Sequence, residues 1–176
     1  CDFPTGKQSR KRGGIWYTPV SGIWQTVWLE SVCAGYIRGL RVTPDVKNSR
    51  VRLTLDCPGG APVAVTVLAD GKSVFETTTA GRELEIHVEA PLLWSPEDPF
   101  LYDLVLKTDG DEVKSYFALR SFEVDGTHFL LNGKPYFVNG LLDQGYFSDG
   151  IYTPASYDAY RDDILQMKAL GFNALR

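Results

Sequence analysis

The polar segment between Asn139 and Thr153 holds the side chains best suited to bind a ligand. It follows an apolar run that ends at Val138, and it contains Asn139, Asp143, Gln144, Tyr146 and Asp149. Arg176 follows a second apolar run. In parallel α/β folds the loops at the carboxyl ends of strands build the site. Amides, carboxylates and aromatic rings at such positions suit a polyhydroxylated ligand, so the residues alone predict a ligand-facing loop.

Other acidic and histidine residues have simpler explanations. Asp162 and Asp163 are neighbours on a predicted helix and point to different faces, so they cannot act as a pair. His87 lies in an alternating strand and His128 at a strand start, and neither has a nucleophile at an interpretable spacing. We expect none of these residues to be catalytic. A further group, the tryptophans, suits stacking on a sugar, but tryptophans in β-domains more often belong to the core; they are Trp16, Trp24, Trp28 and Trp94.

The middle of the chain predicts short antiparallel strands. Residues 51–57 alternate apolar and polar side chains, which is typical of a half-buried strand. Asp70-Gly71 and Asp109-Gly110 lie between strand-like runs and predict hairpin turns, because two-residue turns favour φ > 0. About seven such strands between Glu30 and Val124 predict an immunoglobulin-like β-sandwich.

Two further runs are predicted to be extended. Residues 25–32 are rich in β-branched and aromatic side chains and predict one strand. Residues 113–124 predict another strand, after the Asp109-Gly110 turn.

The C-terminal part changes character. Asn132-Gly133 predicts a hairpin that leads into Pro135–Val138. Ser156 is a predicted N-cap and Gly171 a predicted C-cap of a helix. Its apolar residues recur every three or four positions; they are Tyr157, Tyr160, Ile164, Met167 and Leu170. A buried strand is predicted over 172–175. Strand, helix and strand in this order predict the opening unit of a parallel α/β fold.

Composition narrows the classes of function. The chain has 176 residues, 44% of them hydrophobic, and a formal net charge of −4. This apolar fraction argues against disorder, and the acidic balance against a general nucleic-acid partner. Because no apolar run approaches about 18 residues, no membrane span is predicted. Three cysteines without Cys-x-x-Cys spacing and two histidines predict no metal site, and no cofactor motif is found. Cys33 and Cys57 are expected to be reduced core thiols.

Four segments in order resemble glycoside hydrolase family 2. Residues 15–30 are similar to the end of its sugar-binding jelly-roll domain, and Leu93–Tyr102 resembles a signature of its immunoglobulin-like domain. Residues 129–140 resemble the entry to its catalytic (β/α)8 barrel, and 163–176 resemble the first barrel helix and second strand. The resemblance implies a jelly-roll end at 1–29, an immunoglobulin-like sandwich at 30–124 and a barrel start at 125–176.

The resemblance also implies a function, that of a retaining exo-β-glycosidase. Asp143, Gln144 and Arg176 would contact the carbohydrate substrate, with Arg176 matching an arginine beside the nucleophile. Gln144 departs from the family, because related branches often place a substrate-contacting histidine there. The two catalytic glutamates would lie beyond Arg176, so none of the residues here is assigned as catalytic and the isolated chain is expected to be inactive.

Several alternatives stay open. The only methionine is Met167, and the chain stops where a strand begins, so we interpret it as an internal piece of a longer protein. A carbohydrate-binding or adhesion module with exposed tryptophans is one alternative, and a structural spacer is another. Nucleic acid and membranes are not expected partners, and homo-oligomerisation stays open.

Overall fold

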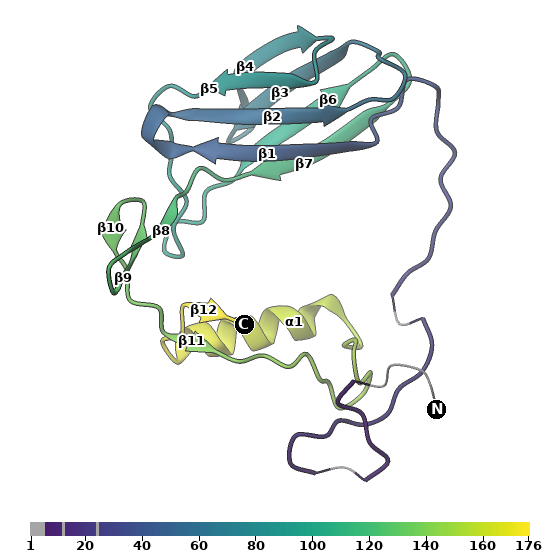
Figure 1. The fold of residues 1–176 in the computed structure, drawn as a ribbon, viewed down its shortest axis with the longest axis vertical. Coiled ribbons are helices and arrows are strands. Elements are labelled where there is room, and N and C mark those ends of the chain that lie inside the picture. Colours follow the sequence, from purple (N-terminus) through teal and green to yellow (C-terminus); the bar gives the residue numbers. More distant parts are fainter. Residues whose placement is uncertain (1–5, 12, 24) are drawn as a thin grey trace. The chain divides into compact units, whose positions relative to one another are not determined.

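The computed structural model describes residues 6–11, 13–23 and 25–176 (Figure 1). The chain divides into two compact units. The larger unit contains Glu30–Asp143 and Leu165–Arg176, and the smaller contains Gln144–Ile164 with the N-terminal segment up to Leu29.

The larger unit contains an antiparallel β-sandwich. One sheet has the strand order β1-β2-β5 and the other β4-β3-β6-β7, and Figure 1 shows the two layers. The strands are β1 (Gly39–Asp45), β2 (Arg50–Asp56), β3 (Val63–Ala69), β4 (Lys72–Thr79), β5 (Glu83–His87), β6 (Tyr102–Lys107) and β7 (Glu112–Phe117). A 3-10 turn, Val46–Asn48, connects β1 to β2. The predicted β-sandwich is therefore confirmed.

The core lies between the two sheets and follows the predicted alternation. In β2 every second residue is buried, which places Val51, Leu53 and Leu55 inside. The facing sheet contributes Val65 from β3 and Leu104 from β6, each about 1% exposed. Burying a large aliphatic side chain stabilises the fold by about 1.5–3 kcal/mol, so these alternating residues hold the sandwich together.

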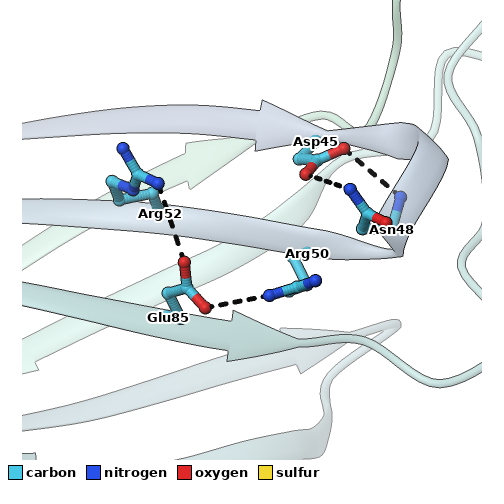
Figure 2. A network of polar contacts seen from close by, with 5 residues as sticks. All are labelled: Asp45, Asn48, Arg50, Arg52 and Glu85. Atoms are coloured by element: carbon cyan, nitrogen blue, oxygen red, sulfur yellow. Dashed lines mark hydrogen bonds and ion pairs between the residues drawn. The ribbon is translucent and has the colours of Figure 1, made fainter.

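The outer face of the β1-β2-β5 sheet is polar and exposed. Figure 2 shows Glu85 between two arginines, with its carboxylate oxygens 3.1 Å from Arg50 Nη1 and 3.7 Å from Arg52 Nη2. At the β1–β2 turn the Asp45 carboxylate accepts hydrogen bonds from the side chain and backbone of Asn48, which lowers the pKa of Asp45. Exposed ion pairs contribute little to stability, so these contacts add little to the free energy that holds the sheet together.

Both predicted sandwich turns connect paired strands, but they use glycine differently. Asp70 and Gly71 join β3 to β4 with φ of 49° and 74°, as a two-residue hairpin requires. Neither Asp109 nor Gly110 belongs to the described residues with positive φ. A Cβ on Gly110 would lie 2.8 Å from Cys33 Sγ. Close approach of the chain, rather than backbone conformation, therefore favours glycine at this second turn.

Two strand predictions are wrong. Among the described residues none pairs as a strand with 25–32, and Val27 and Trp28 are exposed. A segment with high strand propensity forms a strand only where a neighbouring strand completes its backbone hydrogen bonds. The predicted strand over 113–124 is two strands, β7 and β8 (Phe122–Asp125), separated at Leu119. Leu119 is fully buried and its carbonyl accepts a hydrogen bond from Trp94 N, which interrupts the ladder.

The cysteine prediction holds in part. Cys33 and Cys57 are free thiols, but Cys33 is exposed and only Cys57 packs against the core. Burial raises the pKa of the Cys57 thiol, and the nearby carboxylates of Asp56 and Asp111 add to this shift. Cys1 lies outside the described residues.

The C-terminal part of the larger unit adds two small sheets. β9 (His128–Leu131) pairs with β8 and with β10 (Lys134–Pro135), and Asn132-Gly133 forms the predicted turn with φ of 52° and 75°. β11 (Gly140–Leu141) pairs in parallel with β12 (Ala174–Leu175). Because β11 lies inside the segment predicted as a loop from Asn139, the loop itself begins only after Leu141.

The helix α1 (Tyr157–Ala169) connects β11 to β12 and begins one residue after the predicted cap, Ser156. It ends in a Schellman motif, in which Gly171 has φ of 89° and donates its N–H to Lys168 O, while Phe172 N donates to Met167 O. The predicted apolar residues of this helix are largely exposed, with Tyr157 89% accessible.

Candidate functional site

Two asparagines clamp the parallel pair β11–β12. Asn139 N donates to Asn173 Oδ1 at 2.8 Å, and Asn173 N donates to Asn139 O at 3.0 Å. Their amide groups also donate to backbone carbonyls, from Asn173 to Phe137 O at 2.8 Å and from Asn139 to Gly171 O at 2.9 Å. The sequence predicted that Asn139 faces a ligand. In the structure its side chain instead makes a hydrogen bond that helps to fix where the two strands begin.

The clamp places Asp143 and Arg176 together at the carboxyl ends of the two strands. Arg176 N donates to Leu141 O at 3.0 Å, and Asp143 N donates to Arg176 O at 2.8 Å. Both residues are exposed. This edge of the larger unit therefore presents a carboxylate and a guanidinium, groups that bind sugar hydroxyls and pair with a second carboxylate.

Gln144 lies in the smaller unit, where Tyr17 meets it. The Tyr17 hydroxyl donates to Gln144 Oε1, although 127 residues separate the two in the sequence. The Tyr17 ring stacks on Tyr146, with centroids 4.9 Å apart and ring planes 18° apart. Tyr17 was not among the predicted site residues, and its only sequence signal was its place in the aromatic segment 15–30.

Tyr146 lies in an environment that opposes ionisation. Its hydroxyl donates to Tyr152 Oη at 3.2 Å, and the two rings meet edge to face with centroids 5.1 Å apart. Desolvation is the largest cause that raises its pKa to about 12; the hydrogen bond to Tyr152 and the charges of Tyr152 and Tyr17 add to it. Tyr146 therefore stays a neutral phenol at physiological pH and provides a stable face for Tyr17.

The rest of the loop is ordered by its own turn. Phe147 and Ile151 exchange backbone hydrogen bonds of 2.9 and 3.1 Å, and Phe147 packs edge to face on Tyr160 of α1. Asp149 is exposed within this turn. A Cβ on Gly150 would lie 1.7 Å from Thr153 O, so glycine is required for the turn to close.

The larger unit also contains an apolar groove of about 340 Å³. Trp94 lines it, and Arg120 lies 4.3 Å from the centre of the Trp94 ring, where the guanidinium covers one face. Tyr136 contributes a hydroxyl whose pKa is raised by burial and by the charge of Glu97. Arg120 therefore occupies one face of the Trp94 ring, and that face is not open to stacking by a sugar.

Two other tryptophans, Trp16 and Trp28, differ from the core prediction. Trp16 is 48% and Trp28 71% exposed, and both lie outside the β-sandwich. Trp24 lies outside the described residues. The residues described here include no group of three metal-ligating side chains, and no described helix has the length and apolar character to span a bilayer.

Sequence comparison relates the chain to known glycosidases. The profile of "Glycosyl hydrolases family 2" matches residues 35–120. A β-galactosidase of Aeromonas hydrophila subsp. hydrophila is 27% identical over 89% of this chain and 18% of its own length. A β-glucuronidase of Paenibacillus borealis is 28% identical over 69% of this chain and 22% of its own length. The chain thus spans about a fifth of the length of these relatives.

Solved structures of β-glucuronidases match the fold of this chain. A Faecalibacterium prausnitzii β-glucuronidase matches with a TM-score of 0.74 and 31% identity, over 81% of this chain and 24% of its own. A Ruminococcus gnavus β-glucuronidase in complex with D-glucuronic acid matches with a TM-score of 0.71 at 23% identity, over 80% of this chain and 25% of its own, which shows the shared fold. The family profile on the sandwich, the glycosidase relatives and the matching fold together relate this chain to glycosyl hydrolase family 2.

Proposed function

We propose that this chain is part of a longer retaining exo-β-glycosidase. The likeness to family 2 supports a glycosidase, and the observation that carries the proposal further is the parallel pair β11–β12 joined by α1. A strand, a helix and a parallel strand are the repeating unit of a (β/α)8 barrel, whose sites lie at the carboxyl ends of the strands. We assign residues 1–29 to the end of a jelly-roll domain, 30–124 to an immunoglobulin-like domain and 125–176 to the start of the barrel.

The proposed substrate contacts are Asp143, Gln144 and Arg176. Asp143 is the second residue after β11 and Arg176 is the first after β12, which supports a place at the catalytic end of a barrel. Asp143 would accept hydrogen bonds from sugar hydroxyls, and Gln144 would donate its amide hydrogens to them. Arg176 would orient a nucleophilic carboxylate supplied by another part of the enzyme.

Catalysis in this class needs two carboxylates about 5 Å apart, one as nucleophile and one as acid and base. We assign neither role to a residue of this chain, and we expect both from later barrel strands. The 176-residue chain should therefore turn over no glycoside by itself.

The test is to assay the full-length gene product on aryl β-galactoside, β-glucuronide, β-mannoside and β-glucoside. We expect turnover of at least one, with retention of anomeric configuration by NMR. Asp143→Asn should lower kcat/KM about tenfold or more, since hydrogen bonds to charged groups contribute about 1.5–3 kcal/mol. Asp109→Asn, at the sandwich hairpin, is the matched control and should leave kcat/KM unchanged. Turnover by the isolated chain would contradict the assignment of catalysis to later strands, and glycan binding without turnover by the full-length product would favour a binding module.

A further inference from the structure

Tyr17 and Gln144 form a contact that the sequence did not predict and the proposed function does not use. Gln144 is exposed, and an exposed glutamine ordinarily samples many rotamers. Here its Oε1 accepts the Tyr17 hydroxyl hydrogen. A side chain held in one orientation before binding loses less conformational entropy when a ligand arrives.

Tyr17 is itself held from two directions. Its ring stacks on Tyr146, which in turn donates its hydroxyl hydrogen to Tyr152. Its backbone N–H donates to Lys7 O at 2.8 Å, and its carbonyl accepts from Ser9 N at 3.1 Å. Because both the ring and the backbone are anchored, the hydroxyl has a fixed position from which to hold the amide of Gln144.

The direction of this hydrogen bond decides what Gln144 offers to a ligand. An amide side chain has an acceptor oxygen and a nitrogen with two donor hydrogens. Since the oxygen accepts from Tyr17, the Nε2 hydrogens are the groups oriented for a further partner. That partner must be an acceptor, such as a sugar hydroxyl oxygen.

We propose that Tyr17 is a positioning residue that holds Gln144 Oε1 and thereby presents Gln144 Nε2 as a donor to a substrate hydroxyl oxygen. This inference rests on the proposed glycosidase function, and it joins an N-terminal segment to the specificity of a loop 127 residues away. Tyr17 acts through Gln144 and makes no contact with the reacting atoms.

The test is a double-mutant cycle in the full-length gene product, with the best aryl glycoside as substrate. Tyr17→Phe keeps the ring that stacks on Tyr146 and removes the hydroxyl. We expect kcat/KM to fall about three- to tenfold, mainly through a higher KM, as for loss of one hydrogen bond. In a Gln144→Leu background the same substitution should change kcat/KM less than twofold. Tyr116→Phe, at an exposed tyrosine of the sandwich, is the control for loss of a hydroxyl and should have no effect.

The Gln144→Glu variant provides a second test, and its result does not depend on whether the Tyr17→Phe variant folds. Glutamate keeps an oxygen for the Tyr17 hydroxyl but lacks the amide hydrogens, so kcat/KM should fall at least as far as in Gln144→Leu. Native kcat/KM in Gln144→Glu, or equal losses from Tyr17→Phe in both backgrounds, overturns the positioning role and leaves the glycosidase function standing. Absence of turnover of any glycoside by the native full-length product overturns the proposed function, and this inference with it.

Discussion

Asn173→Asp should loosen the edge that carries Asp143 and Arg176 while leaving the sandwich intact. The substitution keeps the shape of the side chain and the Oδ1 acceptor for Asn139 N. It replaces the donor nitrogen that lies 2.8 Å from Phe137 O with a carboxylate oxygen. One hydrogen bond is therefore lost, and two acceptors are left facing each other.

The size of the effect follows from these two contacts. A net hydrogen bond contributes about 0.5–1.5 kcal/mol, and because the contact to Phe137 O is exposed, water can satisfy the acceptor that is left. We expect the free energy of local opening at β11–β12 to fall by about 0.5–1.5 kcal/mol. Since about 1.4 kcal/mol corresponds to a factor of ten, the exchange rate of amides in this pair should rise about 2- to 12-fold.

Native-state hydrogen exchange by NMR measures this directly. The diagnostic amide is Asp143 N–H, which donates to Arg176 O and is protected only while the pair is closed. The matched control is Asn132→Asp, because Asn132 also bridges two backbone groups, Ser121 N and Trp94 O. It should change exchange near Ser121 and leave Asp143 unaffected. An unchanged Asp143 amide in Asn173→Asp, or equal changes in both variants, would refute the clamp.

Two further outcomes are expected. Leu53→Ala removes a fully buried side chain from the sandwich core and should lower the free energy of unfolding in urea by about 2–5 kcal/mol; a loss below about 1 kcal/mol would contradict the packing described. Tyr146 should ionise near pH 12 in a tyrosine NMR titration assigned with Tyr146→Phe, and Tyr152→Phe should lower that pKa. Because the folded pKa lies above the ordinary value of about 10, the stability that Tyr146 contributes is complete below pH 10 and is lost as the pH rises through 12. Ionisation of Tyr146 together with exposed tyrosines would contradict its desolvated environment.

Local sequence patterns were sufficient to predict much of the β-sandwich. The alternation in residues 51–57 predicted which side chains are buried, because successive residues of a strand point to opposite faces. Asp70-Gly71 and Asn132-Gly133 predicted their turns for a similarly local reason, since both positions of each turn have positive φ. The start of α1 after Ser156 and the Gly171 cap also follow from short-range hydrogen bonding.

The tertiary structure decided the features that depend on contacts between residues far apart in the sequence. Residues 25–32 have high strand propensity but join no ladder among the described residues, because pairing needs a neighbour that sequence pattern does not supply. Its local sequence predicts that Asn139 is a polar loop residue, yet it forms a hydrogen bond with Asn173, 34 positions away, that clamps the two strands. Nothing in the sequence distinguishes Tyr17 from the other aromatic residues of its segment, and only folding brings its hydroxyl to Gln144. The sequence by itself thus determined the residue types and local turns, whereas the tertiary structure decided which polar groups meet, since hydrogen bonds form through space.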